Sequence, residues 1–345
     1  MKAQVIKEDI IKFCDSIGVQ AVGFTSAMPF NELKEGYQYR QQQYLHCTFE
    51  ARDSVLDLMD PRRIMEDAKS FICILEPHQP YSQPYSQVKS TSGIGRMASG
   101  TASLDYHKIL DGHLEKLQFF LQEKYDIHGV KLCDTTPLSD RAIAVRAGLG
   151  VLRRNNMFYH KTMGSYVNIA SLLIDFDLEA TDHDKEAIPC GTCQICKVTC
   201  PTKAIIGDGT INSNRCISYL TQKNETSEEE SKMIGNMIYG CDICQLRCPV
   251  NNKVKNPFVE FIVDQEVDLV TLLNIDNATF KNTYGRTASG WRGKRTLQRN
   301  AIAAMGNSGD RGMIEILNKY EDDNRSIIKR EVQRAITRLK NIEVK

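Results

Sequence analysis

CGTCQICKVTCP, residues 190–201, is the most informative stretch of this sequence, and GCDICQLRCP, residues 240–249, is its counterpart. The first spacing is C-x2-C-x2-C-x3-C-P, and Cys216 stands between the two groups. Three thiolates on a tight turn can hold one corner of an iron–sulfur cube, so the fourth must come from elsewhere in the chain. In proteins with two such cubes, the cysteine before the proline ligates the other cluster.

This rule divides eight of the 12 cysteines into two sets of four. We expect one [4Fe–4S] cluster on Cys190, Cys193, Cys196 and Cys248, and the other on Cys200, Cys216, Cys241 and Cys244. Structural zinc usually takes two C-x2-C pairs without a trailing C-P, and disulfides need an oxidising compartment. The spacing favours clusters over both alternatives. The acidic insert 221–238, between the two groups, predicts a helix.

Length and charge limit the remaining possibilities. A chain of 345 residues allows two or three domains that each bury a core. The formal net charge of +1 argues against a wholly basic nucleic-acid binder, although a local basic patch is compatible with it. No apolar run approaches the ~18 residues that span a bilayer, and no export signal is present. We therefore expect a cytoplasmic monomer with no membrane partner.

Alternating strands and helices predict that residues 1–184 form a mixed domain of the α/β or α+β class. The expected strands are 19–25, 70–75, 129–133 and 166–174, and the expected helices are 1–18, 64–69, 104–125 and 140–149. Residues 27–60 and 77–100 are predicted to be irregular. A ferredoxin-like two-cluster module follows over 185–255. Short helices at 297–305, 313–320 and 327–339 resemble HEAT-type units and define a C-terminal segment, 256–345.

Three groups of residues outside the cysteines are candidates for function. Asp134 follows the third expected strand, at the carboxyl end where α/β sheets bind ligands, and is a candidate proton donor. It could instead be a turn-forming aspartate. Asp105, Tyr106 and His107 open the long helix, where a capping role is the alternative. Arg295 and Arg299 belong to a basic C-terminal stretch that could contact RNA phosphates or form a solvated helix surface.

Several stretches together resemble the epoxyqueuosine reductases. They are DYH at 105–107, DTTPLSDRA at 134–142, CPTKAI at 200–205, NRCISYLT at 214–221, the 240–249 group and RNAIAAMGN at 299–307. This resemblance implies reduction of the epoxide of epoxyqueuosine, at the wobble position of tRNA, to queuosine. It also implies a cobalamin between the mixed domain and the cluster module. The implied partners are the tRNA anticodon stem-loop and a low-potential donor such as ferredoxin or flavodoxin.

The resemblance also assigns roles to residues. Asp134 matches the proton donor, and residues 105–107 match the substrate pocket. The residues expected near the corrin are Arg96, Met97, Asp134, Asn155, Phe158, Ser165 and Asp242. The sequence departs from the family pattern at Met97, at Arg153–Arg154 and at Ile169-Ala170-Ser171, which leaves the substrate open. The alternatives are a cobalamin-dependent reductase of a small molecule, similar to the reductive dehalogenases, and a non-catalytic electron-transfer or cofactor-handling protein.

Overall fold

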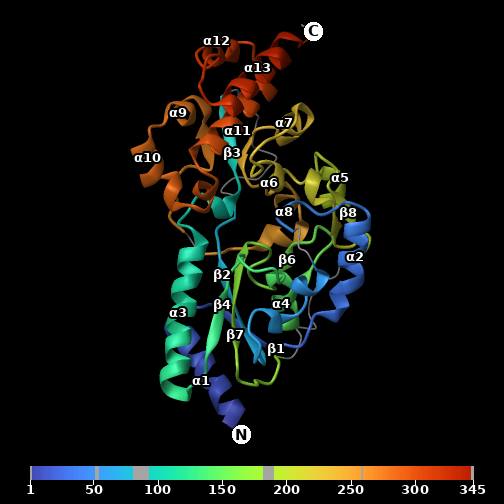
Figure 1. Ribbon diagram of the computed structural model, residues 1–345, viewed down its shortest axis with the longest axis vertical. Coiled ribbons are helices and arrows are strands. Elements are labelled where there is room, and N and C mark those ends of the chain that lie inside the picture. Colours follow the sequence, from blue (N-terminus) through green and yellow to red (C-terminus); the bar gives the residue numbers. More distant parts are fainter. Residues whose placement is uncertain (1, 51–53, 81–92, 182–189, 258, 343–345) are drawn as a thin grey trace.

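The computed structural model describes residues 2–50, 54–80, 93–181, 190–257 and 259–342. The molecule is elongated, with the N-terminal region at one end and the C-terminal helices at the other (Figure 1). The cluster module lies to one side, between the sheet domain and the C-terminal helices. No helix in the described part of the chain is long and apolar enough to cross a membrane.

The mixed domain is built on a four-stranded sheet of order β1-β2-β7-β4. Its strands are β1 (Ala21–Ser26), β2 (Ser70–Pro77), β7 (Val167–Ile174) and β4 (Gly129–Leu132). All four expected strands are confirmed within a few residues. Every pairing is antiparallel, so the domain is of the α+β rather than the parallel α/β form. The parallel-sheet argument for placing Asp134 at a ligand-binding edge therefore does not apply, because β4 pairs only with an antiparallel neighbour.

Alternation along β2 places its side chains on both faces of the sheet. Ile72 and Ile74 pack with α1 (Lys2–Ser16) and α3 (Tyr106–Tyr125), through residues such as Ile10 and Leu114. Phe71, Cys73 and Leu75 pack on the other face, against α4 (Asp140–Arg146). The long helix and the helix after Asp134 are thus confirmed. Each helix covers one face of the sheet. The loop between β4 and α4, which contains Asp134, lies at the end of strand β4.

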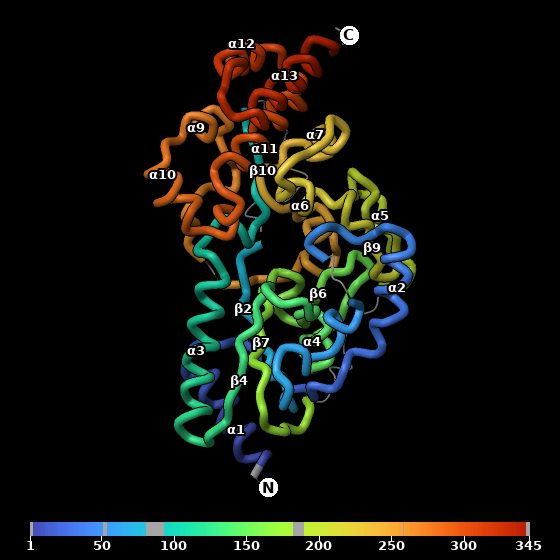
Figure 2. The backbone as a smooth tube through the Cα atoms, viewed as in Figure 1, coloured from blue at the N-terminus to red at the C-terminus, as the bar shows by residue number. Residues whose placement is uncertain are grey.

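Two predictions about the irregular parts of this domain are wrong. The helix expected over 64–69 is absent; a 3-10 turn at Pro61–Arg63, capped by Asp60, precedes the strand instead. A helix, α2 (Lys34–Gln42), forms within 27–60, and residues 51–53 of that loop lie outside the described residues. Figure 2 shows this helix beside the cluster module, where Arg40 Nη2 donates to Ser213 Oγ at 2.9 Å.

The cluster module consists of short elements separated by turns. They are α5 (Ile195–Thr199), β8 (Ile205–Gly207), β9 (Thr210–Ile211), α6 (Ile217–Leu220), α7 (Glu228–Ile234), β10 (Met237–Tyr239) and α8 (Ile243–Leu246). The helix expected in the acidic insert is α7. A capping box fixes its start, because Ser227 Oγ accepts from Glu230 N while the Glu230 carboxylate accepts from Ser227 N.

A second sheet joins all three parts of the chain. β3 (Ile94–Met97) pairs in parallel with β10 and antiparallel with β11 (Glu266–Asp268). This strand falls within 77–100, which was expected to be irregular; residues 81–92 of that stretch lie outside the described residues. Four residues in a Gly-rich and Ser-rich segment carry too little periodicity to reveal a strand. The strand forms because these residues pair with partners about 140 to 170 residues away in sequence, which a local pattern cannot reveal.

The C-terminal segment packs as short helices around one apolar core. These are α9 (Leu269–Asn274), α10 (Asn277–Asn282), α11 (Lys294–Asn307), α12 (Met313–Asn318) and α13 (Ser326–Lys340). The three helices expected here are confirmed as α11, α12 and α13. Gly306 permits α11 to pack closely against α13, since a Cβ atom at this position would lie 2.7 Å from the Cα of Ala335. The HEAT-type description of these helices stays a prediction.

Candidate active site and cluster module

The eight motif cysteines form two groups in space. The thiol of Cys196 lies in the electrostatic field of Cys190, Cys193 and Cys248. The thiol of Cys244 lies in that of Cys200 and Cys216, and Cys241 interacts with Cys216 and Cys244. These are the two sets expected from the spacing, and each contains a cysteine from the distant half of the motif. Their role as cluster ligands stays a prediction that this grouping supports.

The chemistry of the second thiol group fits a bound cationic centre. Burial raises the pKa of Cys216, and it raises the pKa of Cys241 and Cys244 much further. Thiolates in such surroundings need a positive partner, and metal ions deprotonate coordinating thiols outright. This donor set is compatible with iron–sulfur ligation, in which bound iron would supply the positive charge that the thiolates need.

A cavity of about 560 Å³ lies between this second thiol group and the mixed domain. We call it the inner cavity. Its lining includes Cys200, Cys216, Cys241 and Cys244 from the module and Tyr106, His107 and Asp134 from the mixed domain. An outer cavity of about 760 Å³ shares Tyr106, Asp134, Arg141, Ser165 and Trp291 with it, among others. Asp134 thus lies where both cavities meet.

Asp134 is held by contacts to both its backbone and its side chain. Its φ of +55° lies in the left-handed region, and its backbone N–H donates to Asp140 Oδ2 at 3.0 Å. The Tyr106 hydroxyl donates to Asp134 Oδ2 at 2.9 Å. The turn-forming role expected as the alternative is therefore present in the backbone, while the carboxylate itself faces the cavities. One carboxyl oxygen is oriented by Tyr106, which leaves the other for a reacting group.

Asp140 is a second carboxyl group beside Asp134 that sequence analysis did not single out. Burial, followed by the neighbouring charge of Asp134, raises the pKa of Asp140 to about 7. Its Oδ1 atom is buried without a hydrogen-bond partner in the described structure. Because the Asp140 Oδ2 accepts from Asp134 N, this side chain positions the loop that carries Asp134.

The expected substrate-pocket stretch combines capping with cavity lining. Asp105 caps α3, with its Oδ1 accepting from His107 N at 3.1 Å and pairing with His107 Nδ1 at 2.8 Å. This pairing raises the pKa of His107. Tyr106 and His107 stack at 4.1 Å between ring centroids, and both line the inner cavity. The capping alternative therefore holds for Asp105, whereas the two aromatic residues belong to the site.

A buried hydrogen-bond network joins the mixed domain to the cluster module at the cavity wall. Ser165 Oγ donates to Gln245 Oε1 at 2.7 Å and accepts from Asn251 Nδ2 at 2.8 Å. Gln245 Nε2 in turn donates to Asp242 Oδ1 at 3.1 Å. Asn155 lines the same cavity and accepts from Met157 N. The structure thus brings four of the seven residues expected near the corrin to the inner cavity, namely Asp134, Asn155, Ser165 and Asp242.

Four other expected contacts need correction or restriction. Arg96 and Met97 line neither cavity, because β3 lies within the second sheet and turns Met97 into the C-terminal core. Phe158 is 2% exposed, belongs mainly to the sheet core and lines only the outer cavity. Arg299 is 2% exposed and donates to the carbonyls of residues 220, 221 and 223, so it cannot contact tRNA. Arg295, one turn earlier, is exposed.

Of the departures from the family pattern, Ile169 lines the outer cavity, and the others fall outside both cavities. Ser171 is buried within β7. Arg154 lies against the first thiol group, with its backbone N–H directed to Cys190 Sγ at 3.4 Å. Arg153 stacks over Tyr159 at 5.1 Å. Among the described departures, Ile169 alone therefore alters the lining of the site.

Comparison with known proteins agrees with this site. The family model "Epoxyqueuosine reductase QueG, DUF1730" matches residues 59–135, and "4Fe-4S double cluster binding domain" matches 189–251. The epoxyqueuosine reductase of Staphylococcus aureus is 36% identical over 332 residues, covering 94% of this chain and 86% of the relative. That of Lactococcus garvieae is 33% identical, covering 97% of each chain. The chain belongs to the epoxyqueuosine reductase family.

Solved structures of epoxyqueuosine reductases share the whole architecture. The enzyme from Streptococcus thermophilus superposes with a TM-score of 0.87 at 32% identity, covering 98% of this chain and 91% of that one. An epoxyqueuosine reductase solved with an epoxyqueuosine-modified tRNA-Tyr stem loop gives a TM-score of 0.84 at 31% identity, covering 98% and 100%. The antiparallel sheet, the cluster module and the C-terminal helices are therefore a family arrangement.

Proposed function

We propose that this protein reduces the epoxide of epoxyqueuosine in tRNA to the alkene of queuosine. The observation that carries the proposal is a single carboxylic acid, Asp134, at the junction of two cavities, the inner of which is lined by four cysteines. The reaction consumes two electrons and two protons and releases the epoxide oxygen as water. The site therefore needs an electron source and a proton donor, and the proposal assigns these roles to clusters held by the cysteines and to Asp134.

Two [4Fe–4S] clusters in the 189–251 module and a cobalamin in the inner cavity are the proposed cofactors. The inner cavity suits a large flat ring with amide-bearing edges. Small residues line it, namely Ala98, Gly100, Thr101 and Gly240, and its polar side chains include Asn155, Ser165 and Asp242. When bound, cobalamin supplies a low-potential cobalt centre able to react with the epoxide.

Asp134 is the proposed proton donor. Opening the epoxide places negative charge on its oxygen, and a nearby acid lowers the barrier by neutralising that charge as it develops. The Tyr106 hydroxyl holds one Asp134 oxygen at 2.9 Å, and Asp140 fixes the backbone. A solved Bacillus subtilis relative, of TM-score 0.87 and 32% identity, is described with a catalytic aspartate loop swung out of its active site. This supports a catalytic role for the corresponding loop here.

The mouth of the outer cavity is suited to unpaired nucleotides, such as those of an anticodon loop. Trp291 is 61% exposed there, and the Arg292 guanidinium stacks over its ring at 3.8 Å. Phe49 adds a second ring, 4.5 Å from the Arg292 guanidinium. Exposed aromatic faces and arginine planes stack on bases without regard to sequence. This surface favours an RNA substrate over a small molecule.

The test is anaerobic turnover of epoxyqueuosine-tRNA by the Asp134→Asn holoenzyme, followed by nucleoside mass spectrometry. We expect about 100-fold or greater loss of queuosine formation, the usual scale for removal of a general acid. Iron content and cobalamin binding should be unchanged. Asp111→Asn, on the exposed side of α3, is the matched control and should retain full activity. Undiminished turnover by Asp134→Asn would remove that residue from the mechanism.

A further inference from the structure

The two thiol groups differ in where they face. In the second group, Cys200 is buried, and Cys216, Cys241 and Cys244 line the inner cavity together with Cys200. Cys190, Cys193 and Cys196 of the first group are partly exposed, as Cys216, Cys241 and Cys244 are, but they line no cavity with the mixed domain and alternate with the exposed residues Gly191, Thr192, Gln194 and Ile195. Electrons that reach the inner cavity must therefore enter the protein at the first group. The surface around that group is where an electron donor has to approach.

That surface carries exposed apolar side chains. Val198 is 68% exposed and Ile195 is 40% exposed, and both lie on α5, the short helix that bears Cys196. Ile206, on β8, is 39% exposed. Large aliphatic side chains beside a redox ligand contribute nothing to the core when they point into water. Exposed apolar groups with a polar rim are the usual composition of a protein contact site.

The rim of this patch is basic. Lys203 Nζ donates to the carbonyl of Val198 at 2.9 Å, and Lys197 is exposed on the same helix. Arg154 also approaches from the mixed domain, with Nη2 donating to Gly191 O at 2.9 Å. Asp208 is the single acidic residue between 190 and 215, and it pairs with Arg154 Nη1 at 2.9 Å. Among the described residues, neither Lys197 nor Lys203 forms an ion pair with a carboxylate, so both positive charges remain available at the surface.

We propose that the α5 face, formed by Ile195, Val198, Lys197 and Lys203, is the docking surface for a small acidic protein that carries a low-potential one-electron centre. An apolar centre permits close approach to the first cluster, and the basic rim steers an acidic partner. Such contacts are small and short-lived, as electron transfer requires. Two encounters supply the two electrons of one turnover. The inference rests on the proposed function only in that it takes the clusters to be the route for those electrons.

The experiment measures reduction of the oxidised holoenzyme clusters by stopped-flow absorbance, with a reduced acidic ferredoxin as the probe and no tRNA. In the Lys197→Glu/Lys203→Glu variant we expect the second-order rate constant at low salt to fall about 10-fold or more. The wild-type rate should fall as salt rises, whereas the variant rate should change little. Reduction by dithionite should be the same for both proteins. Lys281→Glu/Lys319→Glu, on exposed positions of α10 and the end of α12, changes the charge equally and should leave the rate unaltered.

Val198→Ser provides an independent measurement in case the charge-reversed protein does not take up iron. It should slow reduction by ferredoxin several-fold at every salt concentration, again without affecting dithionite. Equal ferredoxin rates for wild type and Val198→Ser would overturn the proposal. A loss of tRNA affinity in either α5 variant, with unchanged ferredoxin rates, would assign the face to RNA and also overturn it. Because the assay contains no tRNA, failure of epoxide reduction would not alter its outcome.

Discussion

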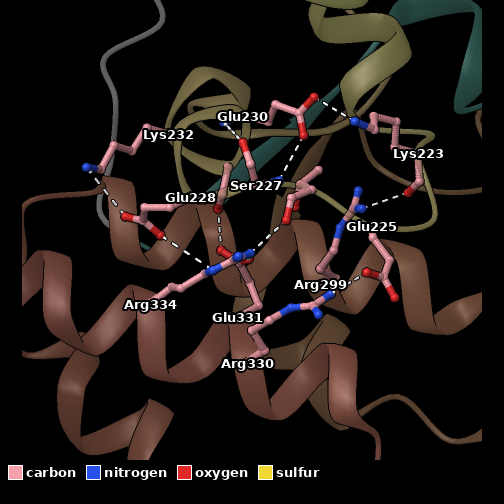
Figure 3. Close-up of polar contacts among 12 residues, drawn as sticks. Lys223, Glu225, Ser227, Glu228, Glu230, Lys232, Arg299, Arg330, Glu331 and Arg334 are labelled. Atoms are coloured by element: carbon pink, nitrogen blue, oxygen red, sulfur yellow. Dashed lines mark hydrogen bonds and ion pairs between the residues drawn. The ribbon is translucent and has the colours of Figure 1, made fainter.

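Replacing Glu331 by Gln should destabilise the protein strongly, whereas the same change at Glu225 should not. Both carboxylates pair with arginines of α13, as Figure 3 shows. The Glu331 side chain is 2% exposed, and Arg338, its partner at 3.0 Å, is 8% exposed. Glu331 also accepts a hydrogen bond from Ser231 Oγ, on α7. Glu225 pairs with Arg330 at 2.9 Å, but these side chains are 63% and 42% exposed.

The expected magnitudes follow from this difference in burial. Two unit charges 3.0 Å apart attract by about 5 kcal/mol at an effective dielectric constant of ~20, before the cost of removing them from water. Deleting one member of a buried pair typically costs about 3–5 kcal/mol, because the remaining charge stays buried without its partner. Arg338 keeps Glu228 at 2.8 Å, so we expect about 2–4 kcal/mol for Glu331→Gln. For Glu225→Gln we expect about 0–1 kcal/mol.

The assay is anaerobic urea unfolding, followed by circular dichroism and by the fluorescence of Trp291, the single tryptophan, which lies just before α11. Added salt should abolish the small effect at Glu225 and leave the effect at Glu331 largely intact. The Glu331 network anchors α7, which lies in the insert between Cys216 and Cys241. This variant should therefore also lose iron faster to a chelator. If the two variants agree within about 0.5 kcal/mol, burial does not decide the strength of these pairs.

Three further outcomes are expected. Because the pKa of Asp140 is raised to about 7 in the folded protein, its contribution to the free energy of unfolding is complete at acid pH and declines as pH rises toward 7. In thermal unfolding, Asp140→Asn should therefore be more stable than wild type by on the order of 2 kcal/mol at pH 8, and should not be more stable at pH 4. Tyr106→Phe, which leaves Asp134 Oδ2 without its donor, should lower single-turnover rates about 10-fold with little change in KM. Arg295→Ala should weaken tRNA binding and reduce the salt dependence of Kd by about one charge, measured by fluorescence anisotropy; an unchanged salt slope would place the tRNA elsewhere.

Placement of the basic residues shows why sequence alone overestimated the RNA-binding face. The C-terminal excess of arginine and lysine suggested phosphate contacts at Arg295 and Arg299 alike. In the folded chain, the Arg299 guanidinium donates hydrogen bonds to backbone carbonyls at and just after the end of α6. Arg334 and Arg338 pair with Glu228, in the acidic insert about 110 residues earlier. Opposite charges far apart in sequence neutralise one another, and a local count of charges cannot detect this.

Cysteine spacing was enough to predict the cluster module, because closely spaced thiolates on a turn of defined length can ligate a [4Fe–4S] cluster in only a few arrangements. Hydrophobic periodicity likewise located the four sheet strands and the long helices, since each must present an apolar face to a core. Strand direction, the pairing of β3 with β10 and β11, and the burial of Met97 and Arg299 depend on contacts between distant segments. Those contacts also create both cavities and bury Asp140, so the site's shape and the raised pKa of Asp140 were decided by the tertiary structure, although the contact between Asp140 and Asp134 is local in sequence.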